Sequence, residues 1–305
     1  MKIFYSELTA NPGYYSFGYS IYAQLEPGDS VADAYDKGFL PFVGARKQEQ
    51  NMMYMVRGCR ISPQAFKEHH YHGRVLRKIE SFAPQGIEVI QHKKEEFEVT
   101  DAFVEFVLGY FNFRFGKEAM PKERLLALLA SPFMTHIVEF RLQGKPIAYT
   151  LEAHTEKSMH VWYITYARTY ENTHLGAYLF INLLRRAKAQ QKEWVYFGGT
   201  YGSWMKYKTN FQPLEYWDGA TWVIDPKSRE LKKLLVSDSL RALAFTDQWR
   251  EAREPYYVAP YPFHSTFQEL RFLMLTLTAT PRVFLGFALV VFITMVSIYV
   301  RYFFN

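Results

Sequence analysis

The sequence predicts an α/β protein with a smaller α+β N-terminal domain and a larger C-terminal domain. Residues 1 to about 60 alternate short apolar and aromatic runs with turn signals, which is typical of short strands. Residues 135–198 read as successive strands, a helix and a further strand. An uncharged apolar run near the C-terminus predicts a transmembrane helix. A chain of 305 residues has room for both domains and for this helix.

The N-terminal part is divided by Asn11-Pro12-Gly13, Pro27-Gly28-Asp29 and Pro41, which favour turns between strands. Ser62-Pro63 is a typical helix start, so we expect a helix over residues 63–82. Its apolar residues fall near one face, and Arg74 and Arg77 belong to a basic cluster on it.

Two further helices are expected before the strands of the C-terminal domain. Residues 101–115 carry Phe103, Phe106, Val107 and Tyr110 at helical spacing, and a leucine-rich helix follows Pro121. These apolar stripes are interpreted as core faces rather than as binding surfaces.

From residue 135 the pattern alternates β-branched and aromatic residues with polar ones. THIVEFRL, PIAYTLEAH and SMHVWYITY predict three antiparallel strands, followed by a helix at about 173–190 and a buried strand at Trp194–Gly198. This order resembles the N-acetyltransferase-like (GNAT, acyl-CoA N-acyltransferase) fold, in which the helix N-terminus binds a phosphate-bearing acyl donor. The loop at residues 167–176 lacks closely spaced glycines, which argues against acetyl-CoA as the donor.

A more specific pattern follows the last of these strands. Tyr196-Phe197-Gly198 precedes a Met-x-Tyr-Lys-x-x-Phe-x-Pro element made of Met205, Tyr207, Lys208, Phe211 and Pro213. Upstream, Tyr170 precedes Leu175, Gly176 and Tyr178, and Arg60-Ile61, Phe66 and the run Gly73 to Arg77 keep a related spacing. Over roughly residues 10–225 the chain resembles the N-end rule aminoacyl-tRNA–protein transferases, the arginyl- and bacterial leucyl-transferase family.

The resemblance implies transfer of an amino acid from a charged tRNA to an amine, with no cofactor and with aminoacyl-tRNA as the donor substrate. Aminolysis of an ester requires a proton acceptor and a donor for the developing oxyanion. Tyr207 and Lys208 are the candidate catalytic residues, and the alternative role for Lys208 is to hold the terminal phosphate of the tRNA. The candidate substrate-binding residues are Tyr170, Leu175, Gly176, Tyr178, Tyr196, Gly198, Met205, Phe211 and Pro213. The alternative is that the motif residues only pack the sheet against a turn.

Basic residues are candidates for tRNA contacts, because Lys and Arg side chains bind phosphates. They are Arg74, Arg77, Arg185 and Arg186, with Lys188 beside them. A solvated basic helix end is the alternative for each one. The net charge of +6 suits contact with nucleic acid or with anionic lipid and establishes neither.

The sequence also departs from the family in two places. The relatives' Cys-x-x-Cys would fall near Met53 and Val56, and the acidic residues ahead of their loop tyrosine are replaced by Ala167-Arg168-Thr169. We therefore expect no metal there, and arginine as the transferred amino acid is in doubt. The single cysteine, Cys59, excludes an internal disulfide framework and a cysteine-based zinc cluster. His69 and His72 share a helix face only loosely, so no metal site is predicted for the cluster His69, His70 and His72.

The apolar run Val283–Val300 contains no charged side chain over 18 residues. As a helix it would span about 27 Å, close to the ~30 Å core of a bilayer. The N-terminus has no signal-peptide pattern, so we expect a single-pass C-terminal anchor with cytoplasmic domains. The predicted organisation is an N-terminal domain at 1–100, the transferase domain at 101–250, a linker at 251–281 and the transmembrane helix at 282–301.

The sequence therefore predicts an aminoacyl-tRNA-dependent transferase at a membrane, acting on a protein, a peptide or a small amine. Two alternatives stay open. The first is an acyltransferase of the same fold that uses an acyl thioester. The second is a binding module that has kept the fold and lost the chemistry.

Overall fold

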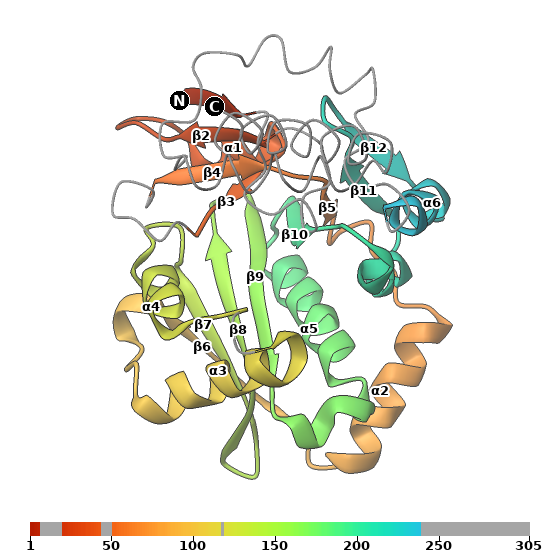
Figure 1. Ribbon diagram of the computed structural model, residues 1–305. Helices are drawn as coiled ribbons and strands as arrows, with labels where there is room; N and C mark the ends of the chain where they lie inside the picture. The colour runs from red at the N-terminus through yellow and green to blue at the C-terminus, as the bar shows by residue number, and fades with distance from the viewer. Residues whose placement is uncertain (7–19, 44–50, 117–118, 239–305) are drawn as a thin grey trace, which may run out of the picture.

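The computed structural model describes residues 1–6, 20–43, 51–116 and 119–238. Two sheets organise these residues, and Figure 1 shows the smaller one above the larger one. The smaller sheet has the order β1-β2-β4-β3 and the larger has the order β12-β11-β5-β10-β9-β8-β7-β6. The predicted mixed α/β fold class is therefore confirmed.

The smaller sheet is antiparallel, and a short helix lies beside it. Its elements are β1 (Lys2–Ser6), β2 (Ser20–Gln24), α1 (Val31–Asp36), β3 (Phe39–Pro41) and β4 (Met52–Met55). The sequence predicted the short strands but not α1, which Ser30 caps by accepting a hydrogen bond from the Asp33 N–H. Apolar side chains of this unit pack on Phe133, Tyr196 and Trp217 of the larger unit, so the two share one core cluster.

The larger sheet begins inside the predicted N-terminal domain. The elements before its central strands are β5 (Gly58–Ile61), α2 (His70–Phe82), β6 (Glu88–Lys93), η2 (Lys94–Glu96), α3 (Asp101–Phe115) and α4 (Lys122–Ala130). Both β5 and β6 precede residue 100, and both are strands of the larger sheet. The predicted domain boundary at residue 100 therefore does not coincide with the division between the two sheets.

The remaining elements complete the predicted order of strands, helix and strand. They are β7 (His136–Leu142), β8 (Lys145–His154), β9 (Ser158–Tyr166), η3 (Arg168–Thr173), α5 (Leu175–Ala189), β10 (Trp194–Gly199), η4 (Ser203–Asn210), β11 (Leu214–Trp217), β12 (Trp222–Asp225) and α6 (Arg229–Ser237). β7, β8 and β9 are antiparallel neighbours as predicted, whereas β9 and β10 run parallel.

Helices cover both faces of the larger sheet (Figure 1). Leucines and Phe180 of α5 pack with Val75 and Ile79 of α2 on one face. Phe103, Val107 and Leu128 of α3 and α4 form a second cluster with Ile137 and Leu151 of the sheet. Burying such side chains is worth about 1.5–3 kcal/mol each. On β10, Val195 and Phe197 pack in the α5 cluster, whereas Tyr196 packs with the smaller unit.

One predicted helix begins later than expected, and the predicted transmembrane helix is not tested. The helix expected at 63–82 begins only at His70: residues 62–66 form a single turn, and His69 and His72 make a capping box. Within the described ranges no helix is long and apolar enough to cross a membrane. The run Val283–Val300 and the predicted linker lie outside those ranges, so both stay predictions.

Candidate active site

The parallel strands β9 and β10 separate partway along their length. Their pairing joins Trp194 to Ser158, Val195 to Met159 and Tyr196 to His160, and it stops there, although β9 continues to Tyr166. We call the region beyond His160 on β9 and beyond Tyr196 on β10 the strand split. In the split, backbone groups of both strands lack the partners that a continuous parallel ladder would supply.

Lys208 of η4 fills part of the strand split. Its Nζ donates hydrogen bonds to the carbonyl oxygens of Phe197 (2.6 Å) and Gly199 (2.7 Å), on either side of Gly198. The side chain is only 3% exposed, and burial lowers the pKa of its ammonium. Lys208 therefore does not lie at the surface, where a tRNA phosphate would reach it. It satisfies acceptors on the edge of β10 that β9 leaves unpaired.

A buried histidine borders the same place from the β9 side. His160 Nδ1 lies 2.9 Å from the hydroxyl of Tyr35, while its Nε2 has no hydrogen-bond partner among the described residues. A Cβ at Gly198 would lie 3.6 Å from His160 Nε2 and 3.9 Å from Lys208 Nζ, so the three residues adjoin. Burial, with a contribution from Lys208, lowers the pKa of His160 to about 3, so the ring is neutral.

His160 and Tyr35 were not predicted as site residues from the sequence. His160 alternates with the core residues Met159 and Val161 on β9, so its pattern indicated only that it faces the other side of the sheet. Tyr35 lies on a helix that was not predicted. The only available signal in the sequence was a histidine, His160, within a strand of otherwise mostly apolar residues.

The N-terminus of α5 lies beside the end of β9. The helix starts at Leu175 after His174, which has a positive φ of 62°, and no side chain caps its first N–H groups. A Cβ at Gly176 would lie 3.4 Å from the Tyr166 ring, so glycine permits the last residue of β9 to pack against the first turn. Uncapped N–H groups at a helix N-terminus favour an anionic ligand.

Three phenols from different elements gather next to this helix end. The rings of Tyr110 on α3 and Tyr166 on β9 lie 4.9 Å apart, and Tyr207 on η4 is 40% exposed with its ring 5.8 Å from Phe180. Burial, together with the neighbouring phenols of Tyr166 and Tyr207, raises the pKa of Tyr110. Tyr207 is the accessible member of the predicted catalytic pair.

The other predicted substrate-binding residues are divided between this region and the core. Tyr178 is partly buried on α5, and Tyr170 of η3 packs on Phe82. The buried set is Leu175, Tyr196 and Phe211. Met205 packs at the edge of the same cluster as Phe211, and the Gln212–Pro213 peptide is cis. Leu175 and Phe211 are core residues, as the alternative interpretation of the motif predicted.

The arginines predicted to contact phosphates lie in two different environments. Arg74 and Arg77 are exposed on α2, and Arg185 is exposed on α5 but forms an ion pair with Glu68 at 2.7 Å. A hollow of about 340 Å³ lies beside that pair, and its lining includes Lys67 and Lys188. These positively charged groups form a basic surface on the α2–α5 side of the molecule.

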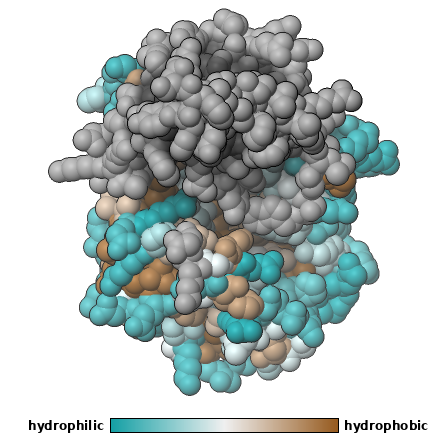
Figure 2. Space-filling model, in the orientation of Figure 1, coloured by the Kyte–Doolittle hydropathy of each residue, from teal (hydrophilic) through white to brown (hydrophobic). Residues whose placement is uncertain are grey.

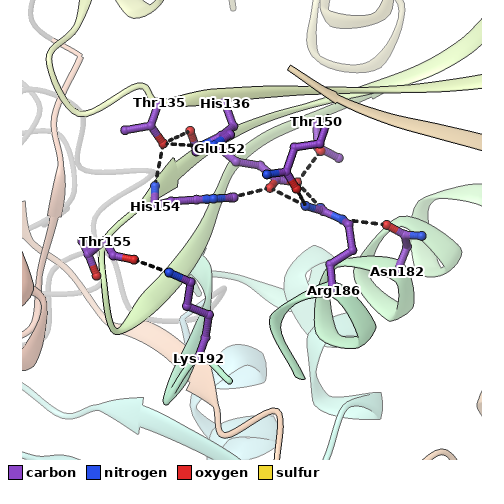
Figure 3. Close-up of polar contacts among 10 residues, drawn as sticks. Thr135, His136, Thr150, Glu152, His154, Thr155, Asn182, Arg186 and Lys192 are labelled. Carbon is purple, nitrogen blue, oxygen red and sulfur yellow. Dashed lines mark hydrogen bonds and ion pairs between the residues drawn. The ribbon is translucent and has the colours of Figure 1, made fainter. Parts of the chain in front are cut away.

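Arg186 lies in a different environment. Figure 3 shows its guanidinium directed at the buried carboxylate of Glu152, and the shortest contact is 2.6 Å. The same carboxylate is 2.7 Å from His154 Nε2, and the His154 ring stacks on His136 at 4.0 Å. Although burial alone would raise it, the attraction of Arg186 and His154 lowers the pKa of Glu152 to about 2. Arg186 is thus an internal ion-pair partner in this structure.

The described residues contain no group of three or more His, Cys, Asp or Glu side chains placed to hold a metal ion. His72 is buried and contributes to the cap of α2, while His69 and His70 lie at the start of that helix.

Comparison with known proteins relates this region to one family. Residues 87–218 match the family model described as arginine-tRNA-protein transferase, C terminus. The match runs from the residue before β6 through β11, and it includes the strand split, the α5 N-terminus and the motif at 205–213. The resemblance predicted from the sequence is confirmed over these residues. No curated protein matches the chain.

Several solved structures are similar at low identity. The C-terminal domain of a putative lysylphosphatidylglycerol synthetase from Agrobacterium fabrum is 14% identical with a TM-score of 0.37, covering 59% of this chain and 54% of that one. L-PGS from Bacillus licheniformis is 13% identical with a TM-score of 0.36, covering 55% and 48%. A possible acetyltransferase from Clostridium difficile 630 is 12% identical with a TM-score of 0.27, covering 33% and 71%. The chain thus spans about half the length of the first two.

Proposed function

We propose that the protein is an aminoacyltransferase that takes its amino acid from a charged tRNA, because residues 87–218 match the family model described as arginine-tRNA-protein transferase, C terminus. The acceptor is an amine of a protein, a peptide or a small molecule. The single observation that carries the proposal is that the matched residues include β9, β10, η4 and the N-terminus of α5, which form the strand split and its border.

In this proposal the ester end of the tRNA enters the strand split beside the α5 N-terminus. The uncapped N–H groups at Leu175 and Gly176 are suited to bind the terminal phosphate or the developing oxyanion. Arg74 and Arg77 on the basic surface bind phosphates farther along the tRNA, since they are exposed.

The reaction is aminolysis of the aminoacyl ester. The acceptor nitrogen attacks the ester carbonyl carbon, the amide bond forms, and the bond to the ribose oxygen breaks. The proton lost from the amine ends on the ribose hydroxyl that leaves. Tyr207 is the proposed catalytic residue, because its side chain is 40% exposed beside the α5 N-terminus. Burial of its hydroxyl raises the pKa of the phenol, so Tyr207 is protonated and acts as the acid that donates a proton to the leaving ribose oxygen, and it regains one from the attacking amine.

Lys208 is proposed as a positioning residue. Its ammonium binds two β10 carbonyls rather than solvent, so it fixes the edge of the split against which the donor lies. His160, held by Tyr35, supports the same edge from β9. A pKa of about 3 makes His160 a weak base, so it is not assigned the proton transfer.

Placement at a membrane is a separate part of the proposal. It rests on the uncharged run Val283–Val300, which would anchor the protein and keep the transferase domain on the cytoplasmic side.

The thioester alternative is distinguished by the donor that binds. Calorimetry of the full-length protein in detergent with charged tRNA and with acetyl-CoA separates the two. We expect tRNA binding that weakens steeply as salt rises and no tight binding of acetyl-CoA. Micromolar acetyl-CoA binding with a salt-insensitive tRNA signal would favour the thioester enzyme. Tight tRNA binding without transfer would favour the binding module.

A further inference from the structure

The last turn of α3 carries two exposed phenylalanines. Phe113 is 36% exposed and Phe115 is 43% exposed, while Phe103, Val107 and Phe111 of the same helix are buried. Figure 2 views the molecule from the α3 side and has apolar, brown surface over this helix among teal polar residues. Two exposed phenylalanines in the last turn of one helix are unusual and indicate a contact surface.

Arginine side chains accompany these rings. The guanidinium of Arg168 on η3 lies over the Phe113 ring at 4.3 Å, and Arg168 is itself exposed. Arg114 reaches Glu171 only at 3.5 Å, and its side chain is 51% exposed. We call Phe113, Phe115, Arg114 and Arg168 the α3 aromatic surface. Planar rings next to guanidinium groups suit ligands that have both a flat π-face and a negative charge.

The α3 aromatic surface is continuous with the strand split. Phe115 contacts Tyr110 at 6.3 Å between ring centroids, and Tyr110 contacts Tyr166 at 4.9 Å. Tyr166 packs at Gly176, where α5 begins. A ligand whose reactive end lies in the split therefore reaches the α3 aromatic surface if the rest of it passes over Tyr166 and Tyr110.

We propose that the α3 aromatic surface binds the unpaired nucleotides at the 3′ end of the donor tRNA by stacking bases on Phe113 and Phe115. The proposal rests on the function proposed above, because it assumes that the tRNA ester lies in the split. Unpaired bases are recognised by aromatic rings and arginine planes, whereas a helical stem offers mainly phosphates. Arg168 supplies both a plane and a charge for the adjoining phosphate.

The test compares two RNA hairpins with one stem, one ending in single-stranded ACCA and one blunt. Uncharged RNA is used, so binding is measured independently of transfer. Stacking of one base is worth about 1–3 kcal/mol, so Phe113→Ala should weaken binding of the ACCA hairpin roughly 5- to 150-fold and leave the blunt hairpin unchanged. Phe113→Trp should retain the affinity, and Arg168→Ala should weaken the ACCA hairpin.

Leu126→Ala on α4 is the matched control, because Leu126 is 44% exposed outside this surface. Thermal melts establish that each variant is folded. Equal affinity of Phe113→Ala and wild type for the ACCA hairpin would overturn the inference, and if transfer persists the proposed function stands. The inference would also be overturned if Phe113→Ala sedimented less with anionic vesicles than wild type did, while its RNA affinity stayed unchanged. The surface would then bind lipid rather than RNA.

Discussion

The Nζ of Lys208 lies 2.7 Å from the carbonyl oxygen of Gly199, inside the sheet and not at its surface. A lysine in a motif that resembles a transferase site thus binds the edge of a strand. The contact explains why the motif follows β10 so closely: the chain returns through η4 to supply the donors that β9 does not. It also predicts that Lys208 affects stability as well as activity.

Lys208→Met should lower both the free energy of unfolding and the transfer rate, because the Phe197 and Gly199 carbonyls lose their donor. Leaving a buried acceptor unpaired costs about 1–3 kcal/mol. Urea unfolding measures the loss, and Lys206→Met is the matched control, since Lys206 is exposed in the same short helix. Equal stability of the two variants would contradict the claim that Lys208 stabilises the edge of β10.

Stability should fall as the pH drops below about 6.5. Burial lowers the pKa of His160 to about 3, and mainly burial lowers those of His136 and His72 to about 4, against 6.5 in the unfolded chain. Between those values the unfolded chain binds more protons, so protonation favours unfolding by up to about 1.4 kcal/mol per histidine and pH unit.

Urea unfolding at a series of pH values tests this dependence. His160→Gln should flatten the curve between about pH 6 and pH 4, whereas the exposed control His70→Gln should not. The comparison uses the slope with pH and not the absolute stability, because replacing His160 also removes its contact with Tyr35. Parallel curves for His160→Gln and wild type would show that His160 does not titrate as expected.

Three of the four arginines predicted to contact tRNA should divide into two kinds. Arg186→Met should cost about 3–5 kcal/mol of stability, because it leaves the buried Glu152 carboxylate without its guanidinium. Arg74→Met and Arg77→Met should leave stability within about 0.5 kcal/mol and each reduce the salt slope of tRNA binding by about 1. Unfolding curves and salt titrations of binding measure both effects. The division is refuted if Arg186→Met changes only the salt slope.

Much of the fold followed from periodicity. The strands β7 to β9, the helix α3 and the strand β10 have long, consistent patterns, and they form where the sequence predicted them. The predicted start of α2 was wrong. Pro63 is favourable at a helix start, but proline also fits the single turn that is closed by the Ser62 carbonyl. His69 and His72 then cap the helix, a use of histidine that residue preferences do not indicate.

The candidate site was predictable only in part, because its geometry depends on contacts that are distant in sequence. The motif marked Tyr207 and Lys208, but it did not indicate which side chain is accessible and which is buried. Tyr35 and His160 are 125 residues apart, and their contact depends on how the two sheets pack. Arg186 read as a basic helix end, and only the fold places Glu152 opposite it.

Deleting residues 281–305 should release the protein from membranes into the soluble fraction. The reason is the loss of the uncharged run Val283–Val300, which is long enough to span a bilayer. Fractionation of cells that express each form measures the distribution. Equal partitioning of the truncated and full-length proteins would contradict the anchor.

The most direct measurement is transfer itself. Full-length protein in detergent is incubated with a pool of radiolabelled aminoacyl-tRNAs and with protein, peptide and small-amine acceptors. The account predicts that label moves from tRNA to an acceptor amine, and that Tyr207→Phe slows this transfer while the protein remains folded. If no acceptor gains label from any charged tRNA, while an acyl thioester does donate its acyl group, the account is contradicted.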